Sequence, residues 1–398
     1  MIVLVANLGS TSLKFKLYET SADESLTALA SGAADRIGQG GSAWKVSGSE
    51  ATREGQADFA DHQAAIAALL AEMPAVGFGD SSRIDAIGFK AVHGGPISGA
   101  VRVDQDVIDT MTSFSDLAPA HNPPYIAAMK AFAQLLPDAW QVAAFETAFH
   151  QSIPMARQVY GIPYDWTEQG VRRYGFHGAS NAYIARRMQQ IRPEAKRVIN
   201  LHLGGSCSAC AIKAGQSVAN SFGTTPQTGI LHAARVGDFD MYALLKLRGM
   251  GLSVDDVLSQ LGKQGGLLGI SGVSADMRDV QKAASEGNER AQLAVDAFVE
   301  SCRHYIGAYA VALGGVDALV FTGGIGQHNI RIREAVCRDL AFLGIRLDET
   351  TSAGADGNAE TLVSRKNSDV EVWVIPTDEE QVVARQTLEV LAGSASAT

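Results

Sequence analysis

The chain has 398 residues, of which 46% are hydrophobic and 19% are charged, a composition typical of a globular protein large enough for two or three domains. Its formal net charge of −10 argues against nucleic acid or an anionic membrane as the main partner. The start MIVLVAN and the interrupted apolar stretch 306–321 predict neither a signal peptide nor a membrane span. We therefore expect a cytoplasmic protein that binds neither nucleic acid nor a membrane.

Residues 1–18 predict a buried strand, a small-residue bend and a returning strand. An apolar run at 2–5 precedes the bend, and apolar and polar residues alternate from 13 to 18. The bend region carries four polar side chains: Asn7, Ser10, Ser12 and Lys14. Backbone N–H groups, hydroxyls and a lysine can converge on an anion, so this hairpin is a candidate phosphate site. The pattern is weak by itself, because small residues commonly serve turn geometry alone.

The pattern occurs a second time at 197–213, where the bend holds Gly204, Gly205 and Ser206. A third glycine turn, within 316–327, follows another apolar run. This repetition predicts a duplicated α/β fold with a central cleft. We expect an N-terminal lobe at 1–148, a C-terminal nucleotide-binding lobe at 149–379, and a C-terminal helix at 380–398 that packs back on the first lobe and frays after 392.

Apolar runs and turn residues predict the other elements. The predicted buried strands are 84–92, 141–145, 197–203, 318–322 and 371–375. The predicted helices include 63–73, 126–136, 289–313 and 330–340. The longest helix is expected to bury Leu293, Phe298, Cys302, Tyr305 and Tyr309 on one face. The polar, glycine-rich stretch 38–55 is expected to be a surface loop or an exposed hairpin.

Cys207 and Cys210 form a CxxC pattern that is also found in redox and zinc sites. Residues three apart in a strand point to opposite faces, and no second Cys/His pair is suitably placed, so packing is the favoured interpretation. The four cysteines give no disulfide framework, which fits a reducing compartment.

Several polar clusters surround histidines at predicted strand ends. Taken singly, His93, His150, His202 and His232 are best interpreted as structural histidines with satisfied hydrogen bonds. The functional interpretation gains weight where histidine, arginine, lysine and carboxylate all occur beside glycine turns, because phosphoryl groups need cationic donors and a metal needs nearby carboxylates.

The chain resembles the acetate kinase family almost from end to end. The resemblance rests on NLGSTSLKF (7–15), VHGG (92–95), LAPAHNP (117–123), FETAFHQSIP (145–154), RRYGFHGAS (172–180), HLGGS (202–206), GISGVSADMRD (269–279), FTGGIG (321–326) and IPTDEE (375–380). It implies the two-lobed actin-like ATPase (ribonuclease H-like) fold. It also implies direct transfer of the γ-phosphoryl of ATP to acetate, propionate or butyrate, with Mg²⁺ or Mn²⁺, in a homodimer.

The resemblance also implies roles for individual residues. His177, Arg235, His121, Lys90 and Glu146 are expected at the phosphoryl-transfer site. Ser10, Ser12, Lys14, Gly204, Gly205, Asp276, Arg278, Gly323, Gly324 and Gly326 are expected to bind ATP. Asn7 and Glu379 are expected to hold the metal, with Glu380 as the alternative to Glu379. Val92, Ala120, Phe176 and Pro226 are expected to line the acyl pocket. A surface ion pair stays open for Asp276 and Arg278, as does core packing for Val92, Phe176 and Pro226.

The chain departs from the family pattern at several of these positions. Lys90 stands in place of arginine, Glu146 in place of aspartate, Gly205 in place of asparagine and Asn181 in place of histidine. A lysine keeps the charge but loses the two-pronged contact of arginine. Ala120 replaces a larger aliphatic residue, which should widen the acyl pocket and favour propionate or butyrate.

Three other functions stay open on the sequence. The first is a sugar or polyol kinase, which needs a catalytic carboxylate as base. The second is a nucleotide-dependent interaction protein similar to Hsp70 or actin. The third is a degenerate homologue with no kinase activity or with another phosphoryl donor.

Overall fold

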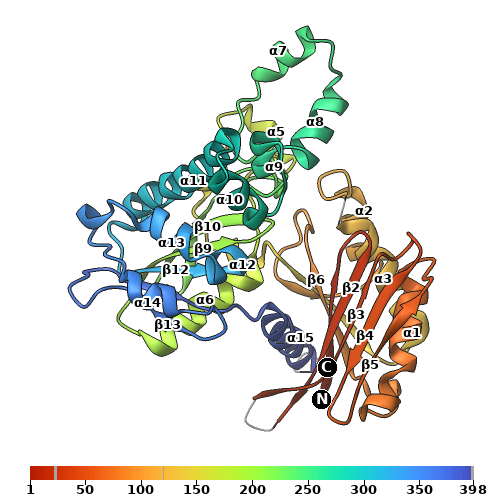
Figure 1. Cartoon of the computed structure of the whole chain (residues 1–398). Coiled ribbons are helices and arrows are strands. Elements are labelled where there is room, and N and C mark those ends of the chain that lie inside the picture. Colours follow the sequence, from red (N-terminus) through yellow and green to blue (C-terminus); the bar gives the residue numbers. More distant parts are fainter. Residues whose placement is uncertain (22–24, 120, 396–398) are drawn as a thin grey trace. The chain divides into compact units, whose positions relative to one another are not determined.

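A computed structural model describes residues 1–21, 25–119 and 121–395 of the chain (Figure 1). The chain divides into two compact units, Met1–Ala148 with Asp378–Thr398, and Phe149–Thr377. Asp378 and Glu379 thus belong to the first unit, whereas we expected the boundary after residue 379. Asp378 belongs to the first unit because its carboxylate accepts hydrogen bonds from two residues of that unit. The donors are Gln381 N (3.0 Å) and the Tyr18 hydroxyl (3.2 Å).

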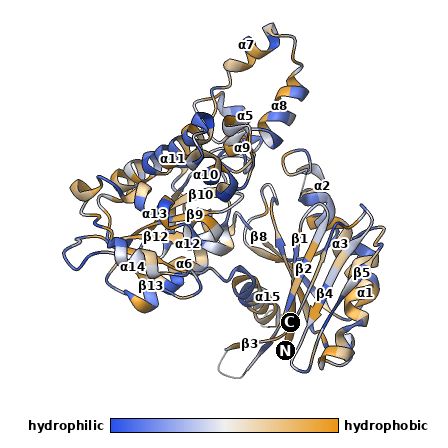
Figure 2. Ribbon diagram, in the orientation of Figure 1, coloured by the Kyte–Doolittle hydropathy of each residue, from blue (hydrophilic) through white to orange (hydrophobic). Residues whose placement is uncertain are grey.

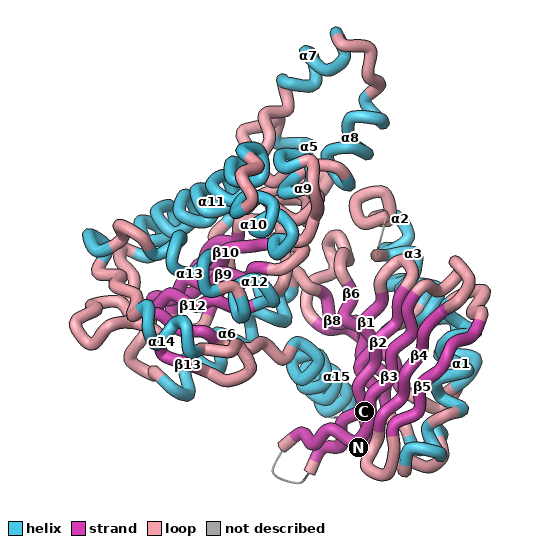
Figure 3. The backbone as a smooth tube through the Cα atoms, in the orientation of Figure 1, coloured by secondary structure: helices cyan, strands magenta, loops and turns pink. Residues whose placement is uncertain are grey.

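The first unit contains an eight-stranded sheet in the order β5-β4-β3-β2-β1-β6-β8-β7 (Figure 3). Its strands are β1 (Ile2–Leu8), β2 (Ser12–Thr20), β3 (Leu26–Asp35), β4 (Ser42–Ser47), β5 (Thr52–Ala57), β6 (Ala86–Ala91), β7 (Ala100–Arg102) and β8 (Trp140–Phe145). Strands β1 to β5 form an antiparallel meander, and β6 and β8 run parallel to β1. The glycine-rich stretch 38–55 lies largely in the β4–β5 hairpin, so the hairpin alternative is confirmed.

Helices cover both faces of this sheet. They are α1 (His62–Ala71), α2 (Gln105–Ser113), α3 (Asn122–Leu135) and α15 (Glu379–Ala395), with 3-10 turns η1 (Met73–Val76) and η2 (Ser81–Arg83). Phe15, Phe89 and Phe132 share a core with α1 on one face. Helix α15 packs on the other face, where Gly88 faces Thr387 closely enough that a Cβ would lie 2.3 Å from the threonine hydroxyl. The expected return of the C-terminus is therefore observed, but the helix continues to Ala395 instead of fraying after 392.

The second unit repeats the arrangement of the first in a six-stranded sheet of order β11-β10-β9-β12-β14-β13. Its strands are β9 (Arg197–Leu203), β10 (Cys207–Lys213), β11 (Gln216–Asn220), β12 (Ala318–Thr322), β13 (Thr361–Leu362) and β14 (Glu371–Val374). Strands β9 to β11 form an antiparallel meander, and β12 and β14 extend the sheet in parallel, as β6 and β8 do beside β1. The predicted duplication is confirmed at the level of strand order.

The helices of the second unit form two layers around its sheet. They are α4 (Met155–Gln158), α5 (Tyr164–Glu168), α6 (Gly178–Ile191), α7 (Ala243–Gly249), α8 (Val254–Lys263), α9 (Gly266–Ser271), α10 (Met277–Ser285), α11 (Glu289–Leu313), α12 (Gly323–His328), α13 (Ile330–Cys337) and α14 (Glu349–Gly354), with 3-10 turns η3 (Ala148–His150) and η4 (Ala341–Leu343). Helix α11 has the predicted bounds and ends at Gly314 in the left-handed conformation. Leu293 was wrongly expected on its buried face. The buried stripe runs through Ala294, Phe298 and Cys302, and Leu293 lies about 100° away from Ala294 around the helix.

The cysteines confirm the packing interpretation. Cys207 lies in the core under α11, and Cys210 lies in the core under α6, on opposite faces of β10. Burial raises the pKa of each of these two thiols to about 12. All four cysteines are free and buried, which makes them inert small apolar residues.

The third glycine turn begins helix α12 directly after β12. Gly323 has a φ of 75°, and a Cβ on it would lie 2.7 Å from the Leu203 carbonyl oxygen of β9. Only glycine fits this contact, because both the backbone conformation and the space exclude a side chain. A Cβ on Gly324, the next residue, would instead have no atom within 4 Å.

We predict that Gly323→Ala lowers the free energy of unfolding by about 1–3 kcal/mol, because the new methyl group meets backbone in a strained conformation. Gly324→Ala is the matched control, and it should be neutral or stabilising by up to about 1 kcal/mol, since alanine favours a helix. Urea denaturation followed by circular dichroism measures both. Equal stability of the two variants would contradict the prediction.

Candidate functional site

The first hairpin brings together its four predicted polar residues at one end of β1 and β2. The bend closes with a hydrogen bond from Gly9 N to Ser12 O (2.9 Å). Asn7 and Lys14 are direct cross-strand partners, so their side chains share a face of the sheet. The Asn7 Oδ1 accepts a hydrogen bond from the Tyr125 hydroxyl (3.3 Å). Ser10 and Lys14 are exposed, whereas Asn7 and Ser12 are half-buried.

Lys14 also borders a cavity of about 310 Å³ on the sheet surface. Lys16, Lys45 and Glu380 line the same cavity. Glu380 therefore lies among lysines, while Glu379, one residue earlier, contacts Lys90. The two glutamates that the sequence could not separate thus have different surroundings.

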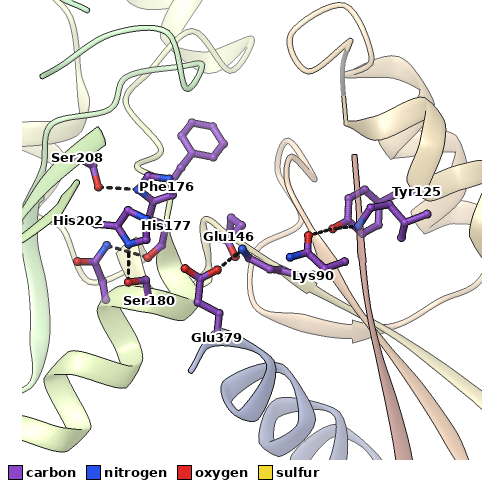
Figure 4. A network of polar contacts seen from close by, with 12 residues as sticks. Lys90, Tyr125, Glu146, Phe176, His177, Ser180, His202, Ser208 and Glu379 are labelled. Atoms are coloured by element: carbon purple, nitrogen blue, oxygen red, sulfur yellow. Dashed lines mark hydrogen bonds and ion pairs between the residues drawn. The ribbon is translucent and has the colours of Figure 1, made fainter. Parts of the chain in front are cut away.

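Lys90, Glu146 and Glu379 form a largely buried cluster in the first unit (Figure 4). Lys90 comes from β6, Glu146 follows β8, and Glu379 begins α15. The Lys90 Nζ lies 3.8 Å from Glu146 Oε1 and is hydrogen-bonded to Glu379 Oε2. Burial opposes the charge of Lys90, but the two carboxylates outweigh it and raise the lysine pKa. Two carboxylates against one ammonium group leave the cluster with a negative charge.

Tyr125 of α3 contacts the first hairpin and lies close enough to Lys90 for their charges to interact. Its hydroxyl donates to Asn7 Oδ1 and accepts a hydrogen bond from Leu8 N (3.1 Å). Burial raises the pKa of Tyr125, and its hydroxyl therefore stays protonated as a donor. Tyr125 was not predicted from the sequence, because its spacing there is that of an ordinary apolar helix residue.

His121, Val92 and Ala120 belong to the region around α3. His121 is the half-buried N-cap residue of α3, and Val92 packs partly against the core of the first unit. Ala120 lies outside the described residues, so the expected widening of the acyl pocket stays a prediction. His93 is confirmed as structural, since its buried ring stacks on Phe114 and accepts a hydrogen bond from Gly95 N (3.0 Å).

His177 is held in an unusual conformation in the second unit. It has a φ of 57° and directly precedes α6. Its Nδ1 lies 2.9 Å from the Ser208 hydroxyl, and its ring packs on that of His202, with centroids 4.1 Å apart (Figure 4). A residue other than glycine in this backbone region is strained, and such strain occurs preferentially at functional sites. His202, which we expected to be structural, thus directly contacts a predicted site residue.

Arg235 and two of the predicted acyl-pocket residues also belong to the second unit. The Arg235 guanidinium donates to the Pro226 carbonyl, and burial lowers the pKa of Arg235. Phe176, next to His177, is buried and packs edge-on against Phe222, with centroids 5.7 Å apart. Val92 lies in the first unit, so the structure describes the three pocket residues in two separate groups.

A cavity of about 510 Å³ in the second unit is lined by five of the ten predicted nucleotide residues. It is lined by Gly204, Gly205, Ala275, Asp276, Met277, Arg278, Gly324, Ile325, His328 and Asn329. Gly323 and Gly326 are buried and do not line it. Asp276 caps α10 and makes a two-pronged ion pair with exposed Arg278, whose hydrogen bonds lower the Asp276 pKa to about 2. Asp276 and Arg278 therefore form a surface ion pair and also line the cavity, so the two interpretations that the sequence left open for them are compatible.

Five residues of this cavity were not predicted from the sequence. They are Ala275, Met277, Ile325, His328 and Asn329. The sequence could have indicated these residues only because each lies within three positions of a predicted nucleotide residue. The walls are braced by Asn329, whose amide exchanges hydrogen bonds with Gln281 of α10 (2.8 and 3.3 Å), and by fully buried Arg333, which donates to the Gly326 and Gln327 carbonyls (3.1 and 2.6 Å).

His150 and His232 are confirmed as structural histidines. The His150 Nε2 donates to the Phe176 carbonyl (2.9 Å), and its Nδ1 pairs with the Ser217 hydroxyl (2.8 Å). The His232 Nδ1 accepts a hydrogen bond from Cys207 N (2.9 Å). Burial lowers the pKa of His150 to about 4 and that of His232 to about 3.

The fold and these sites define a class of protein, a kinase of the duplicated actin-like ATPase fold. A model of the acetokinase family matches residues 2–385, and the chain belongs to this family of phosphotransferases that use a carboxyl group as acceptor.

Individual relatives agree with this assignment over nearly the whole chain. An acetate kinase of Bacteroides thetaiotaomicron is 38% identical over 401 residues, which cover 98% of this chain and 100% of that protein. An acetate kinase of Clostridium botulinum is 41% identical over 403 residues, with coverage of 98% and 100%. The crystal structure of Porphyromonas gingivalis acetate kinase has a TM-score of 0.88 at 38% identity, with coverage of 98% and 99%. That of a propionate kinase from Francisella tularensis has a TM-score of 0.90 at 33% identity, with coverage of 98% and 99%.

We predict that Lys90→Met lowers the free energy of unfolding by about 3 kcal/mol at pH 7, because it leaves two buried carboxylates without their cation. Lys90→Arg keeps the charge and should recover most of this loss. Lys45→Met is the control, since Lys45 makes only an exposed pair with Glu54 (3.6 Å), worth less than about 1 kcal/mol. Urea titrations of the three variants measure the effect.

Because the folded-state pKa of Lys90 is raised, its contribution to the free energy of unfolding should persist up to about its ordinary pKa of 10.5 and be lost only at higher pH. A loss for Lys90→Met no larger than that for Lys45→Met would contradict the prediction.

We predict that the second unit loses stability on acidification from pH 6.5 to about 4. In this range the unfolded state binds protons at His150 and His232 that the folded state excludes, so the free energy of unfolding falls by up to about 1.4 kcal/mol per pH unit for each histidine. His150→Gln should make this slope shallower, and substitution of exposed His304 should leave it unchanged. Urea midpoints between pH 4 and 7.5 measure the slope, and equal slopes in His150→Gln and the parent would refute the assignment.

Proposed function

We propose that this protein transfers the γ-phosphoryl group of ATP directly to a short-chain carboxylate, forming an acyl phosphate and ADP, and that it also catalyses the reverse reaction. The observation that carries the proposal is the double use of the β9–β10 hairpin. Its glycine bend, Gly204 and Gly205, lines the 510 Å³ cavity, while its residues His202 and Ser208 contact His177. The same hairpin thus borders a cavity large enough for a nucleotide and contacts His177, whose backbone is strained.

The reaction needs positioning and charge more than covalent chemistry. A carboxylate oxygen attacks the γ-phosphorus, and the bond from that phosphorus to the β–γ bridging oxygen breaks, so that ADP leaves with the electron pair. A short carboxylic acid is already ionised at neutral pH, so no general base is required. His177, Arg235 and His121 are assigned as donors to the transferred group, which spreads negative charge over its equatorial oxygens.

Lys90 and Glu146, which lie in one cluster of the first unit, are also assigned to phosphoryl transfer. The ammonium group of Lys90 is held by two carboxylates, which keeps it protonated and fixed in place. Ser10, Ser12 and Lys14 are assigned to the phosphates of ATP, because two hydroxyls and an exposed ammonium group lie at and beside the bend of the first hairpin.

The proposal includes Mg²⁺ or Mn²⁺ with ATP, held by Asn7 and Glu379. Their amide and carboxylate oxygens are the donors that such a cation prefers, and the Lys90 cluster carries an excess of one carboxylate. The described residues contain no group of three or more His, Cys, Asp or Glu side chains that could hold a metal by themselves. This fits a cation that is bound partly by protein oxygens and partly by the phosphates of the substrate. When bound, it would neutralise part of the phosphate charge.

The acceptor is proposed to be acetate or a slightly longer straight-chain acid. Phe176 and Pro226 supply buried apolar surface close to His177 and Arg235 in the second unit, and half-buried Val92 supplies apolar surface in the first. The solved relatives include both an acetate kinase and a propionate kinase. The sugar or polyol kinase alternative is not favoured, because the family match is to carboxylate kinases.

We further propose a homodimer in a reducing cytoplasm. Helices α7 and α8 and the segment before them expose a run of large apolar side chains, which Figure 2 shows as hydrophobic positions on α7 and α8. They are Met241, Tyr242, Leu245, Met250, Val254 and Leu258. A patch of this kind suits a second copy of the chain. The four free cysteines fit a reducing compartment, and none of the described helices is long and apolar enough to span a membrane.

The test of the proposed function is an assay that traps acyl phosphate as hydroxamate. With ATP and Mg²⁺, we expect hydroxamate from acetate, propionate or butyrate. Release of ADP is followed in parallel, because phosphate esters of sugars and polyols form no hydroxamate, and we expect no ADP release that depends on glucose or glycerol. The values of kcat/KM across the three acids then identify the preferred acceptor, where one methylene is worth about 1–3 kcal/mol. Phosphorylation of the neutral acceptors without that of the acids would overturn the proposal.

We predict that Arg235→Ala lowers kcat about 10²–10³-fold, because a preorganised donor to the transferred group is lost. Arg248→Ala is the control, since Arg248 is an exposed cation on α7. Activity of Arg235→Ala equal to the parent's would show that the phosphoryl site is wrongly placed.

A further inference from the structure

The conformation of His177 is fixed by contacts to both its backbone and its ring. Its carbonyl accepts two hydrogen bonds from Asn181, one from the backbone N–H (2.9 Å) and one from Nδ2 (2.8 Å). These bonds hold the strained backbone at the start of α6. The ring is therefore presented to the sheet at a set position, and its remaining freedom is rotation about the side-chain bonds.

Two neighbouring strand residues receive that ring. Ser208 of β10 and His202 of β9 are directly opposite each other in the antiparallel register, so their side chains share a face of the sheet. The His177 ring packs on His202 with a tilt of 38°, and its Nδ1 lies 2.9 Å from Ser208 Oγ. His202 is itself held, because its Nδ1 pairs with the Ser180 hydroxyl of α6 (2.8 Å). Figure 4 shows these four residues together.

We propose that Ser208 is a positioning residue for phosphoryl transfer, whose hydroxyl engages Nδ1 of His177 and thereby directs Nε2 to the transferred phosphoryl group. The inference rests on the role proposed above for His177. Since Nδ1 is bonded to Ser208, a contact of the His177 ring with a phosphoryl oxygen has to use Nε2. Ser208 is fully buried, so water cannot easily replace its hydroxyl.

A hydroxyl suits this task in both protonation states of the ring. It can donate to Nδ1 of a neutral imidazole that carries its hydrogen on Nε2, and it can accept from Nδ1–H when the ring is protonated, because its O–H bond can rotate. In both of these pairings Nε2 carries a hydrogen and can donate to an anionic oxygen. A carboxylate at position 208 would instead favour the protonated ring alone.

The test compares Ser208→Ala and Ser208→Cys with the parent in the hydroxamate assay. We expect kcat to fall about tenfold or more, as when other groups that orient a functional histidine are removed. The KM for ATP should stay within about twofold, because the cavity residues are unchanged. Cysteine nearly preserves the volume of serine but forms weak hydrogen bonds, so Ser208→Cys should follow Ser208→Ala. The ¹⁵N NMR signals of the His177 ring should shift in both variants.

Ser217→Ala is the matched control, because it removes a buried hydroxyl 2.8 Å from the Nδ1 of structural His150. It should lower stability without shifting the His177 signals. The proposal is overturned if Ser208→Ala keeps the parent kcat and His177 signals, or if Ser208→Cys restores both, which would leave packing volume as the only role of Ser208.

His177→Asn separates this inference from the proposed function. If it is inactive while Ser208→Ala is fully active, only the inference about Ser208 fails. If His177→Asn keeps full activity, the role assigned to His177 is wrong. If the parent forms no acyl phosphate with any acid, the proposed function itself fails.

Discussion

The close approach of Gly323 to the backbone of Leu203 is the constraint on which the second unit depends. It joins the end of β12 to the end of β9 with no side chain between them, so that helix α12 begins beside the bend of the β9–β10 hairpin. Gly204 and Gly205 of that bend and Gly324 of that helix then line one cavity. The absence of side chains leaves backbone groups accessible, which is the surface that a phosphate chain requires.

The same hairpin extends this constraint to the chemistry. Its two strands place His202 and Ser208 opposite each other beneath His177, and its bend borders the nucleotide cavity. A shift of the hairpin would therefore move both the cavity and the histidine. Arg333 and the Asn329–Gln281 pair hold the other wall of the cavity, and their bonds are to backbone carbonyls and amides that cannot change with protonation. The second unit thus combines a fixed cavity with a fixed histidine.

The departures from the family pattern have structural counterparts. Glu146 reaches Lys90 within one buried cluster, so the longer carboxylate and the shorter cation occur together. Asn181, found where the family resemblance leads us to expect histidine, donates to the His177 carbonyl and accepts a hydrogen bond from Asn200 Nδ2 (2.8 Å). Gly205 places no side chain at the edge of the cavity, and a Cβ at this position would have no atom within 4 Å. The first two changes preserve polar contacts with neighbouring residues, whereas the third opens space.

The sequence by itself determined the duplication of the fold, the two hairpins that begin its halves, helix α11, the opposite orientation of Cys207 and Cys210, and the family. These follow from local alternation, turn residues and ordered motifs, which act over a few residues. It did not determine the role of Tyr125, the different surroundings of Glu379 and Glu380, or the Ser208–His177 contact. These depend on residues far apart in the chain, such as Asn7 and Tyr125 or Lys90 and Glu379, which only tertiary packing brings together. Gly323 combines the two kinds of information. The sequence predicts a glycine turn at this position, but only the close approach of the Leu203 backbone explains why no other residue fits.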